Sequence, residues 1–116
     1  MDFKKEISVT VTGEHIARAL RSRKRGLLAA TTCPLAEALR DMFPKCPTAV
    51  NSCGICIMDT DFEVRAAYEV PPHGKAFLAA FDDGKFDQGD DDFVDSFRLV
   101  QTWTRGRKGS SLRRRP

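Results

Sequence analysis

The chain has 116 residues, of which 41% are hydrophobic and 30% are charged. This length suits one domain with a modest core, and the composition excludes wholesale disorder. The sequence contains no run of about 18 apolar residues. Its charged N-terminus has no apolar segment behind it, so we expect neither a membrane span nor a signal peptide. These features predict a cytoplasmic protein with no membrane partner.

The charges are segregated along the chain. Residues 1–30 carry seven Lys or Arg against three acids, residues 31–104 carry six against thirteen, and residues 105–116 carry six and no acid. The basic segments favour polyanions, while the acidic middle repels them. We predict a single domain over 1–104, followed by a disordered basic tail over 105–116 that has little to bury.

The first half of the chain predicts one strand and two helices. Residues 7–12 alternate apolar and hydroxyl side chains, which indicates a half-buried strand. Thr12 then suits the N-cap of a short helix over 13–20. A second helix is expected over 34–43, because apolar residues recur there at helical spacing and Pro44 follows.

The second half of the chain is richer in strand patterns. Residues 48–58 read as a strand weakened by a bulge at Gly54, and they form a hairpin with the strand after them. The remaining predicted elements are a strand over 62–70, a helix over 73–81 that ends near Gly84, and a strand over 93–103. The predicted fold class is α+β, a mainly antiparallel sheet of three or four strands with two or three short helices on one face.

A dense cationic segment precedes the second helix. Four Lys or Arg side chains crowd into five residues before Gly26, in what we predict to be a loop. The helix start has Thr32 as its predicted cap and Pro34 where a missing N–H costs nothing. Cations beside helix-start N–H groups form an anion site, and Arg binds phosphate bidentately. The predicted ligand-binding residues are Arg21, Arg23, Lys24, Arg25, Thr32 and Cys33. The alternative is a solvated loop, or one that pairs with the chain's own acidic segment.

The chain has four cysteines, and a disulfide framework is disfavoured in the cytosol. Three alternatives remain for their role: buried thiols, a zinc site or redox chemistry. Cys53 and Cys56 have the spacing of half a zinc ribbon. The other two, Cys33 and Cys46, lie thirteen residues apart and form no second close pair. We therefore favour buried thiols, with no metal site and no cofactor. A helix start beside cations would lower the pKa of Cys33.

An acidic stretch follows the third predicted helix. It does not match the EF-hand pattern, which requires a Gly where Asp92 stands. Such a surface can mimic nucleic acid and occupy a basic groove on another protein. The candidate protein-interaction residues are Asp87, Asp90, Asp91 and Asp92, and the alternatives are a solvated loop or a divalent-cation site. For His15 and His73 we expect structural or surface roles. Because no nucleophile–base pair is legible, we predict no enzymatic activity and no catalytic residue.

Four short motifs occur in a fixed order, and together they carry a resemblance. They are Val11-Thr12-x-Glu14-His15-Ile16, Cys33-Pro34-Leu35-Ala36-x-Ala38-Leu39, Ala76-Phe77-x-x-x-Phe81-Asp82-x-Gly84 and Phe97-x-Leu99. The chain resembles, over roughly residues 7–99, a group of small orphan accessory proteins of tailed bacteriophages and mobile elements. The resemblance implies action in a bacterial host cytoplasm, where such proteins bind and disable a host factor, a nucleic acid or a defence signal. Two departures from the group are the basic insert before the second helix and the acidic loop after Gly84.

Three binding functions follow. In the first, the chain is a non-enzymatic accessory protein that sequesters or blocks an anionic ligand, either a nucleotide-like signal or a nucleic acid. Its role is in counter-defence, and its binding pocket is built across a homo-oligomer. The alternative is an inhibitor that uses the acidic stretch to occupy a basic surface of a host defence protein. A third is a general nucleic-acid binder that uses the basic segment and the tail, with strong salt dependence.

Overall fold

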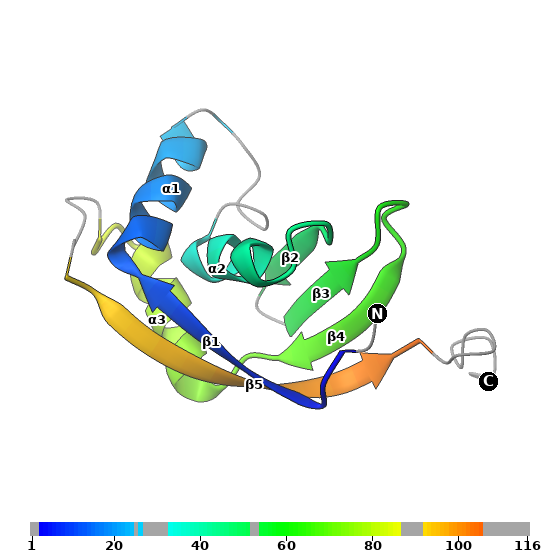
Figure 1. Ribbon diagram of the computed structural model, residues 1–116. Coiled ribbons are helices and arrows are strands. Elements are labelled where there is room, and N and C mark those ends of the chain that lie inside the picture. Colours follow the sequence, from blue (N-terminus) through cyan, green and yellow to red (C-terminus); the bar gives the residue numbers. More distant parts are fainter. Residues whose placement is uncertain (1–2, 25, 27–32, 52–53, 87–91, 106–116) are drawn as a thin grey trace.

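The computed structural model describes residues 3–24, 26, 33–51, 54–86 and 92–105. These residues form three helices and five strands, which confirms the predicted α+β class (Figure 1). In chain order the elements are β1 (Glu6–Thr12), α1 (Gly13–Lys24), α2 (Pro34–Met42), β2 (Thr48–Asn51), β3 (Gly54–Met58), β4 (Val64–Glu69), α3 (Pro72–Asp82) and β5 (Val94–Thr104).

The five strands form one antiparallel sheet in the order β1-β5-β4-β3-β2. The prediction of three or four strands was too low, because residues 48–58 are two strands and not one. β2 and β3 pair with each other, with Asn51 opposite Gly54. Gly54 has a φ of 149°, and a Cβ atom there would lie 2.7 Å from the carbonyl oxygen of Tyr68. The glycine therefore lets β3 begin in close contact with β4, which the predicted bulge did not anticipate.

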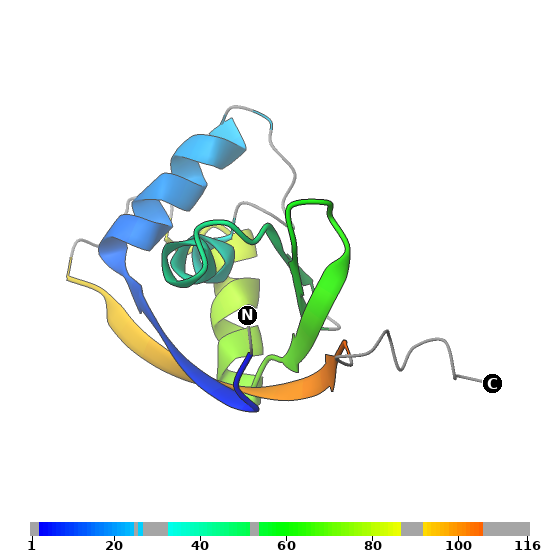
Figure 2. The same ribbon diagram turned by 45° about the vertical axis from the view of Figure 1, so that its right-hand side comes forward.

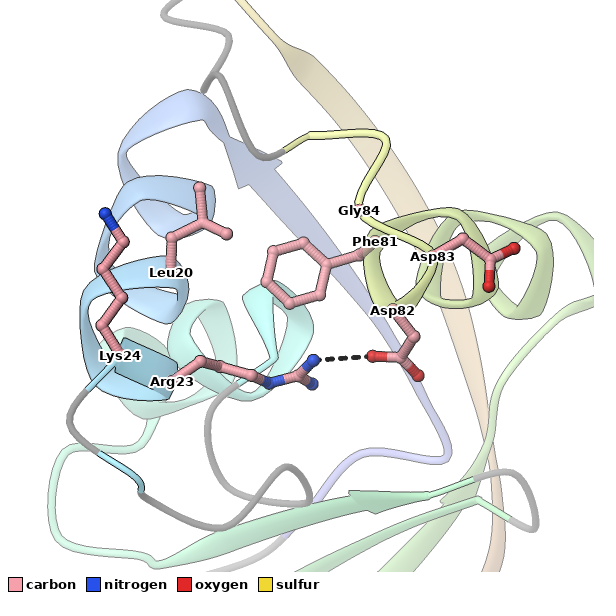
Figure 3. Close-up of a pocket in the computed structure, with 7 residues that line it drawn as sticks. All are labelled: Leu20, Arg23, Lys24, Phe81, Asp82, Asp83 and Gly84. Atoms are coloured by element: carbon pink, nitrogen blue, oxygen red, sulfur yellow. Dashed lines mark ion pairs between the residues drawn. The ribbon is translucent and has the colours of Figure 1, made fainter.

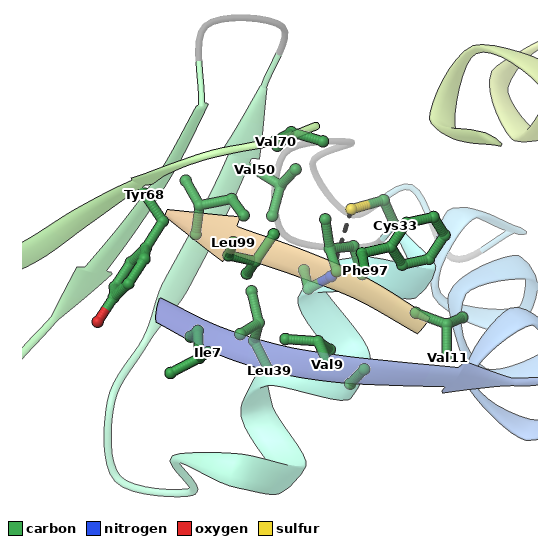
Figure 4. Close-up of a cluster of buried hydrophobic side chains, with 14 of the residues drawn as sticks. Ile7, Val9, Val11, Cys33, Leu39, Val50, Tyr68, Val70, Phe97 and Leu99 are labelled. Atoms are coloured by element: carbon green, nitrogen blue, oxygen red, sulfur yellow. Dashed lines mark hydrogen bonds between the residues drawn. The ribbon is translucent and has the colours of Figure 1, made fainter. Parts of the chain in front are cut away.

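The sheet curls, and α2 lies in the hollow of the curl (Figure 2). β1 alternates as predicted, with Ile7, Val9 and Val11 buried between exposed residues. Their side chains point to the same side of the sheet as Phe97 and Leu99 of β5 (Figure 4). Complete burial of one such side chain is worth about 1.5–3 kcal/mol, so this shared face holds the fold together.

Helix α2 supplies much of the core on the helical side. Its residues 34–39 are all buried, and they include the apolar Leu35, Ala36, Ala38 and Leu39. Helix α3 adds an aromatic cluster, in which Phe77 lies 5.5 Å from Phe97 and 5.2 Å from Phe93, measured between ring centroids. Gly84 follows α3 with a φ of 84°, so the predicted glycine stop is confirmed.

β5 ends at Thr104, the last residue of the predicted domain, and the residue after it still contacts the sheet. Arg105, assigned to the tail by its sequence, donates its backbone N–H to the carbonyl of Arg65 at 3.0 Å. Its guanidinium also pairs with Glu63 at 2.9 Å. Arg105 therefore belongs to the folded part, while the rest of the predicted tail, 106–116, lies outside the described residues. None of the helices in the described ranges is long and apolar enough to cross a membrane.

Candidate anion-binding site between α1 and α3

The cationic segment forms the last turn of a helix and not a loop. Helix α1 continues to Lys24, so Arg21, Arg23 and Lys24 all lie within it. The prediction ended this helix at Leu20 because the apolar spacing stops there. Arg and Lys are nevertheless good helix formers, and cations in a last turn are stabilised by the negative end of the helix dipole. Arg25 lies outside the described residues.

A pocket of about 640 Å³ opens between the ends of α1 and α3. Its floor is apolar, with Leu20 from α1 and Phe81 from α3 (Figure 3). Charged side chains form its rim: Arg23 and Lys24 on one side, and Asp82 and Asp83 on the other. The volume is within the range of small-molecule sites, which is about 300–1,000 Å³.

Arg23 spans this pocket. Its guanidinium lies 2.9 Å from the carboxylate of Asp82 and 4.8 Å above the ring centroid of Phe81. The pairing with the chain's own acidic segment, one of the two alternatives for these cations, is therefore present for Arg23. Lys24 extends away from Asp82, and Asp83 points away from α1 (Figure 3). The two cations of the rim thus do not converge on one point.

Cys33 caps helix α2 and occupies the place predicted for an anion. Its Sγ accepts the N–H of Ala36 at 3.4 Å, and its carbonyl accepts the N–H of Glu37 at 3.1 Å. The prediction that Thr32 caps this helix was wrong, although Pro34 does stand in the first turn. Thr32 itself lies outside the described residues. Cys33 is 5% exposed, its Sγ already accepts the N–H of Ala36, and Pro34 has no N–H, so few free N–H groups remain at this helix start to bind an anion.

Burial raises the pKa of the Cys33 thiol, contrary to the expected lowering. The N–H groups at the helix start and the charge of Arg23 act in the opposite direction, but desolvation outweighs them. Cys33 is therefore a neutral, protected thiol near the Arg23–Asp82 pair. Cys46 is also buried, as predicted, whereas Cys56 is only half-buried and Cys53 lies outside the described residues. Within the described ranges no three His, Cys, Asp or Glu side chains gather as metal ligands.

A polar network fixes α1 against α2 and so sets the position of the basic turn. Arg18 binds Asp41 with two hydrogen bonds of 3.2 and 2.7 Å, and His15 Nε2 lies 2.9 Å from the same carboxylate. The hydrogen bonds from Arg18, followed by that from His15, lower the pKa of Asp41 to about 2, against an opposing effect of burial. We predicted a structural or surface role for His15 but did not single out its partners. The sequence signal for these partners was the four-residue spacing of Glu37 and Asp41, which places both carboxylates on one face of α2.

Thr12 shows which nitrogen of His15 carries the proton. The Thr12 N–H donates to Nδ1 at 2.9 Å, so Nδ1 is an acceptor and the proton on Nε2 faces Asp41. This is the reciprocal half of a capping box, with His15 in the position usually held by Glu or Gln. The Thr12 hydroxyl lies 3.2 Å from the same Nδ1. Because the backbone already uses that lone pair, we assign the contact to helix capping and not to a nucleophile and its base.

The predicted acidic interaction surface is mostly outside the described residues. Asp87, Asp90 and Asp91 fall in the undescribed segment, and Asp92 is exposed next to it. For His73 we also predicted a structural or surface role, and the residue is exposed. Its Nε2 lies 3.4 Å from the Asp95 carboxylate, and its ring centroid lies 4.6 Å from that of Phe97. Its placement adds no acid–base partner to the α1–α3 pocket.

The chain was compared with protein-family models, with curated proteins and with solved structures. None of the three comparisons gave a match.

Proposed function

We propose that the protein is a non-enzymatic binding protein that holds a small anionic ligand at the pocket between α1 and α3. The observation that carries the proposal is the placement of Arg23 and Lys24, from the basic last turn of α1, on the rim of a pocket with an apolar floor; Arg21 belongs to the same turn but does not line the pocket. Arg21 and Lys24 are exposed. In the described part of the chain no carboxylate lies within ion-pair distance of either.

The chemistry of the pocket favours an anionic group attached to an apolar or ring-shaped body. Leu20 and Phe81 provide apolar contact, and the last turn of α1 provides the charge. A phosphate ester of a ring compound, such as a nucleotide, has both parts. An inorganic anion would use only the charge, and would compete with Asp82 for Arg23 without gaining apolar contact. Sequestration of such a ligand is the accessory role that we propose for the chain, as a phage-type counter-defence protein.

Isothermal titration with nucleoside monophosphates, with inorganic phosphate as the comparison, tests the proposal. We expect saturable binding of a nucleotide that weakens at least about tenfold in Arg23→Ala and Lys24→Ala, because each removes a charge-assisted contact. Arg98→Ala is the matched control, since Arg98 is exposed on β5, away from the residues that line the pocket. An equal loss of nucleotide affinity in Arg98→Ala, or no saturable binding of any nucleotide, would contradict the proposal.

A further inference from the structure

The hairpin between β3 and β4 carries an exposed aromatic residue in a strained conformation. Phe62 has a φ of 65°, and it is the one residue other than glycine with a positive φ among the residues that the structure describes. This left-handed region costs an L-residue roughly 1–2 kcal/mol. The Phe62 side chain is 71% exposed, so core packing does not offset the strain.

The turn around Phe62 is rigidly built. Asp59 Oδ1 accepts the N–H groups of Asp61 and Glu63 at 2.8 and 3.1 Å, and the Asp59 carbonyl accepts that of Phe62 at 2.9 Å. Arg65 and Arg105 approach the Asp59 carboxylate at 3.6 and 3.8 Å. These contacts fix the backbone of the turn that carries the exposed Phe62 side chain, which lowers the backbone entropy lost when a partner binds there.

Phe62 forms one wall of a groove of about 610 Å³. The segment between α2 and β2 forms another wall, and it leads into β2, which pairs with β3 (Figure 1). Pro44 and Pro47 lie in that segment, and Met58 of β3 also lines the groove. Two prolines keep this wall stiff, and methionine adapts its shape to an inserted side chain. The groove is thus suited to one apolar side chain of a partner.

Both charged side chains that line the groove are cationic. Arg40 and Lys45 line it, and no carboxylate does. Arg40 is paired with Glu37, but Lys45 is exposed and has no ion-pair partner in the described ranges. The α1–α3 pocket differs, because two carboxylates stand on its rim. The groove therefore complements a negative charge next to an apolar group.

We propose that this groove is a docking site for an extended segment of a partner protein. The segment inserts one apolar side chain between Phe62 and the two prolines and places a neighbouring Asp or Glu on Lys45. Phe62 acts as the aromatic anchor, the kind of residue that dominates the binding free energy of protein interfaces. This surface is separate from the α1–α3 pocket, and its assignment does not depend on the proposed nucleotide binding.

Selection from a displayed library of short random peptides tests the docking site. We expect enriched peptides to combine an apolar residue with adjacent Asp or Glu. Their affinity should fall at least about tenfold in Phe62→Gly and in Lys45→Glu, as at interface hot spots. Arg98→Glu, a charge reversal on the exposed face of β5, should leave the affinity unchanged.

Phe62→Gly also separates binding from folding. Glycine adopts the positive φ without strain, so this variant should unfold at a higher urea concentration than the wild type while it loses the peptide. Peptides that bind Phe62→Gly as well as wild type, a basic consensus, or a lack of enrichment would each overturn the proposal. Concentration-dependent self-association that Phe62→Gly abolishes would also overturn it, because the occupant would then be a second copy of this chain.

Discussion

Arg23 in the last turn of α1 and Asp82 in the last turn of α3 form an ion pair of 2.9 Å that joins the ends of two helices. The Asp82 side chain is 59% exposed and that of Arg23 is 27% exposed, so water already screens the pair. Such a pair contributes at most about 1 kcal/mol to stability. An incoming anion competes directly with Asp82 for Arg23, and this competition makes the aspartate a useful probe of the site.

Replacement of Asp82 by Asn should strengthen anion binding while the free energy of unfolding changes by less than about 1 kcal/mol. The change removes the internal competitor and one negative charge from the rim of the pocket. Titration of wild type and Asp82→Asn with the same nucleotide measures the effect. Asp95→Asn serves as the control, since Asp95 lies on β5 beside His73. Weaker binding in Asp82→Asn would show that the carboxylate contacts the ligand.

The Gly54→Ala change should destabilise the sheet by more than about 2 kcal/mol, because the new Cβ would meet a backbone carbonyl and the φ of 149° strains an alanine. Gly26→Ala is the matched control. Gly26 also has a positive φ, of 79°, but no atom lies within 4 Å of the position of its Cβ. Urea unfolding of both variants separates the steric effect from the conformational one. Equal losses of unfolding free energy in the two variants would mean that the protein relieves the contact with Tyr68 at little cost in free energy.

Acid should weaken the link between α1 and α2. The pKa of Asp41 is lowered from 3.8 to about 2, so its contribution is present above pH 4 and is lost as the pH falls toward 2. Since the Asp41 side chain is 51% exposed, we expect about 1 kcal/mol or less. Urea unfolding of wild type and Asp41→Asn at a series of pH values tests this. The difference between the two proteins should shrink below pH 4, and a constant difference would contradict the assignment.

Cys33 should react slowly with thiol reagents in the folded protein. Its pKa is raised by burial, and its side chain is 5% exposed, so both the thiolate fraction and access are low. Iodoacetamide treatment followed by peptide mass spectrometry measures labelling at each cysteine. Urea should release the reactivity of Cys33, which serves as an internal control. Fast labelling of Cys33 in the native protein would indicate that the start of α2 opens readily.

The strands and helices with a strong apolar period were predictable from the sequence. β1 alternates over its whole length, α2 repeats its apolar residues at helical spacing, and Gly84 ends α3 as a left-handed residue should. The second half of α1 was missed because Arg21 to Lys24 have no apolar period, although they favour helix. The split of residues 48–58 was missed because Gly54 is equally typical of a bulge and of a close contact between strands.

The candidate sites were less predictable than the fold. The sequence placed Cys33 beside cations but contains no direct measure of its burial, and burial decides the direction of its pKa shift. The pairing of Arg23 with Asp82 depends on two helix ends that lie far apart in the chain. The conformation of Phe62 could not be expected, because such turn positions favour Gly or Asn. Each of these features depends on tertiary packing and not on local propensity.

The order of strands in the sheet has a consequence for synthesis. β5 is the last of the five strands in the chain, yet it lies between β1 and β4 and pairs with both. Until the ribosome has released β5, β1 has no neighbour in the sheet and the exposed edge of β4 is open to other chains. The fold thus requires a contact across almost the whole chain, from Glu6 to Val100, which is slow to form. Nascent chains that stop before β5 should therefore depend on chaperones to stay in solution.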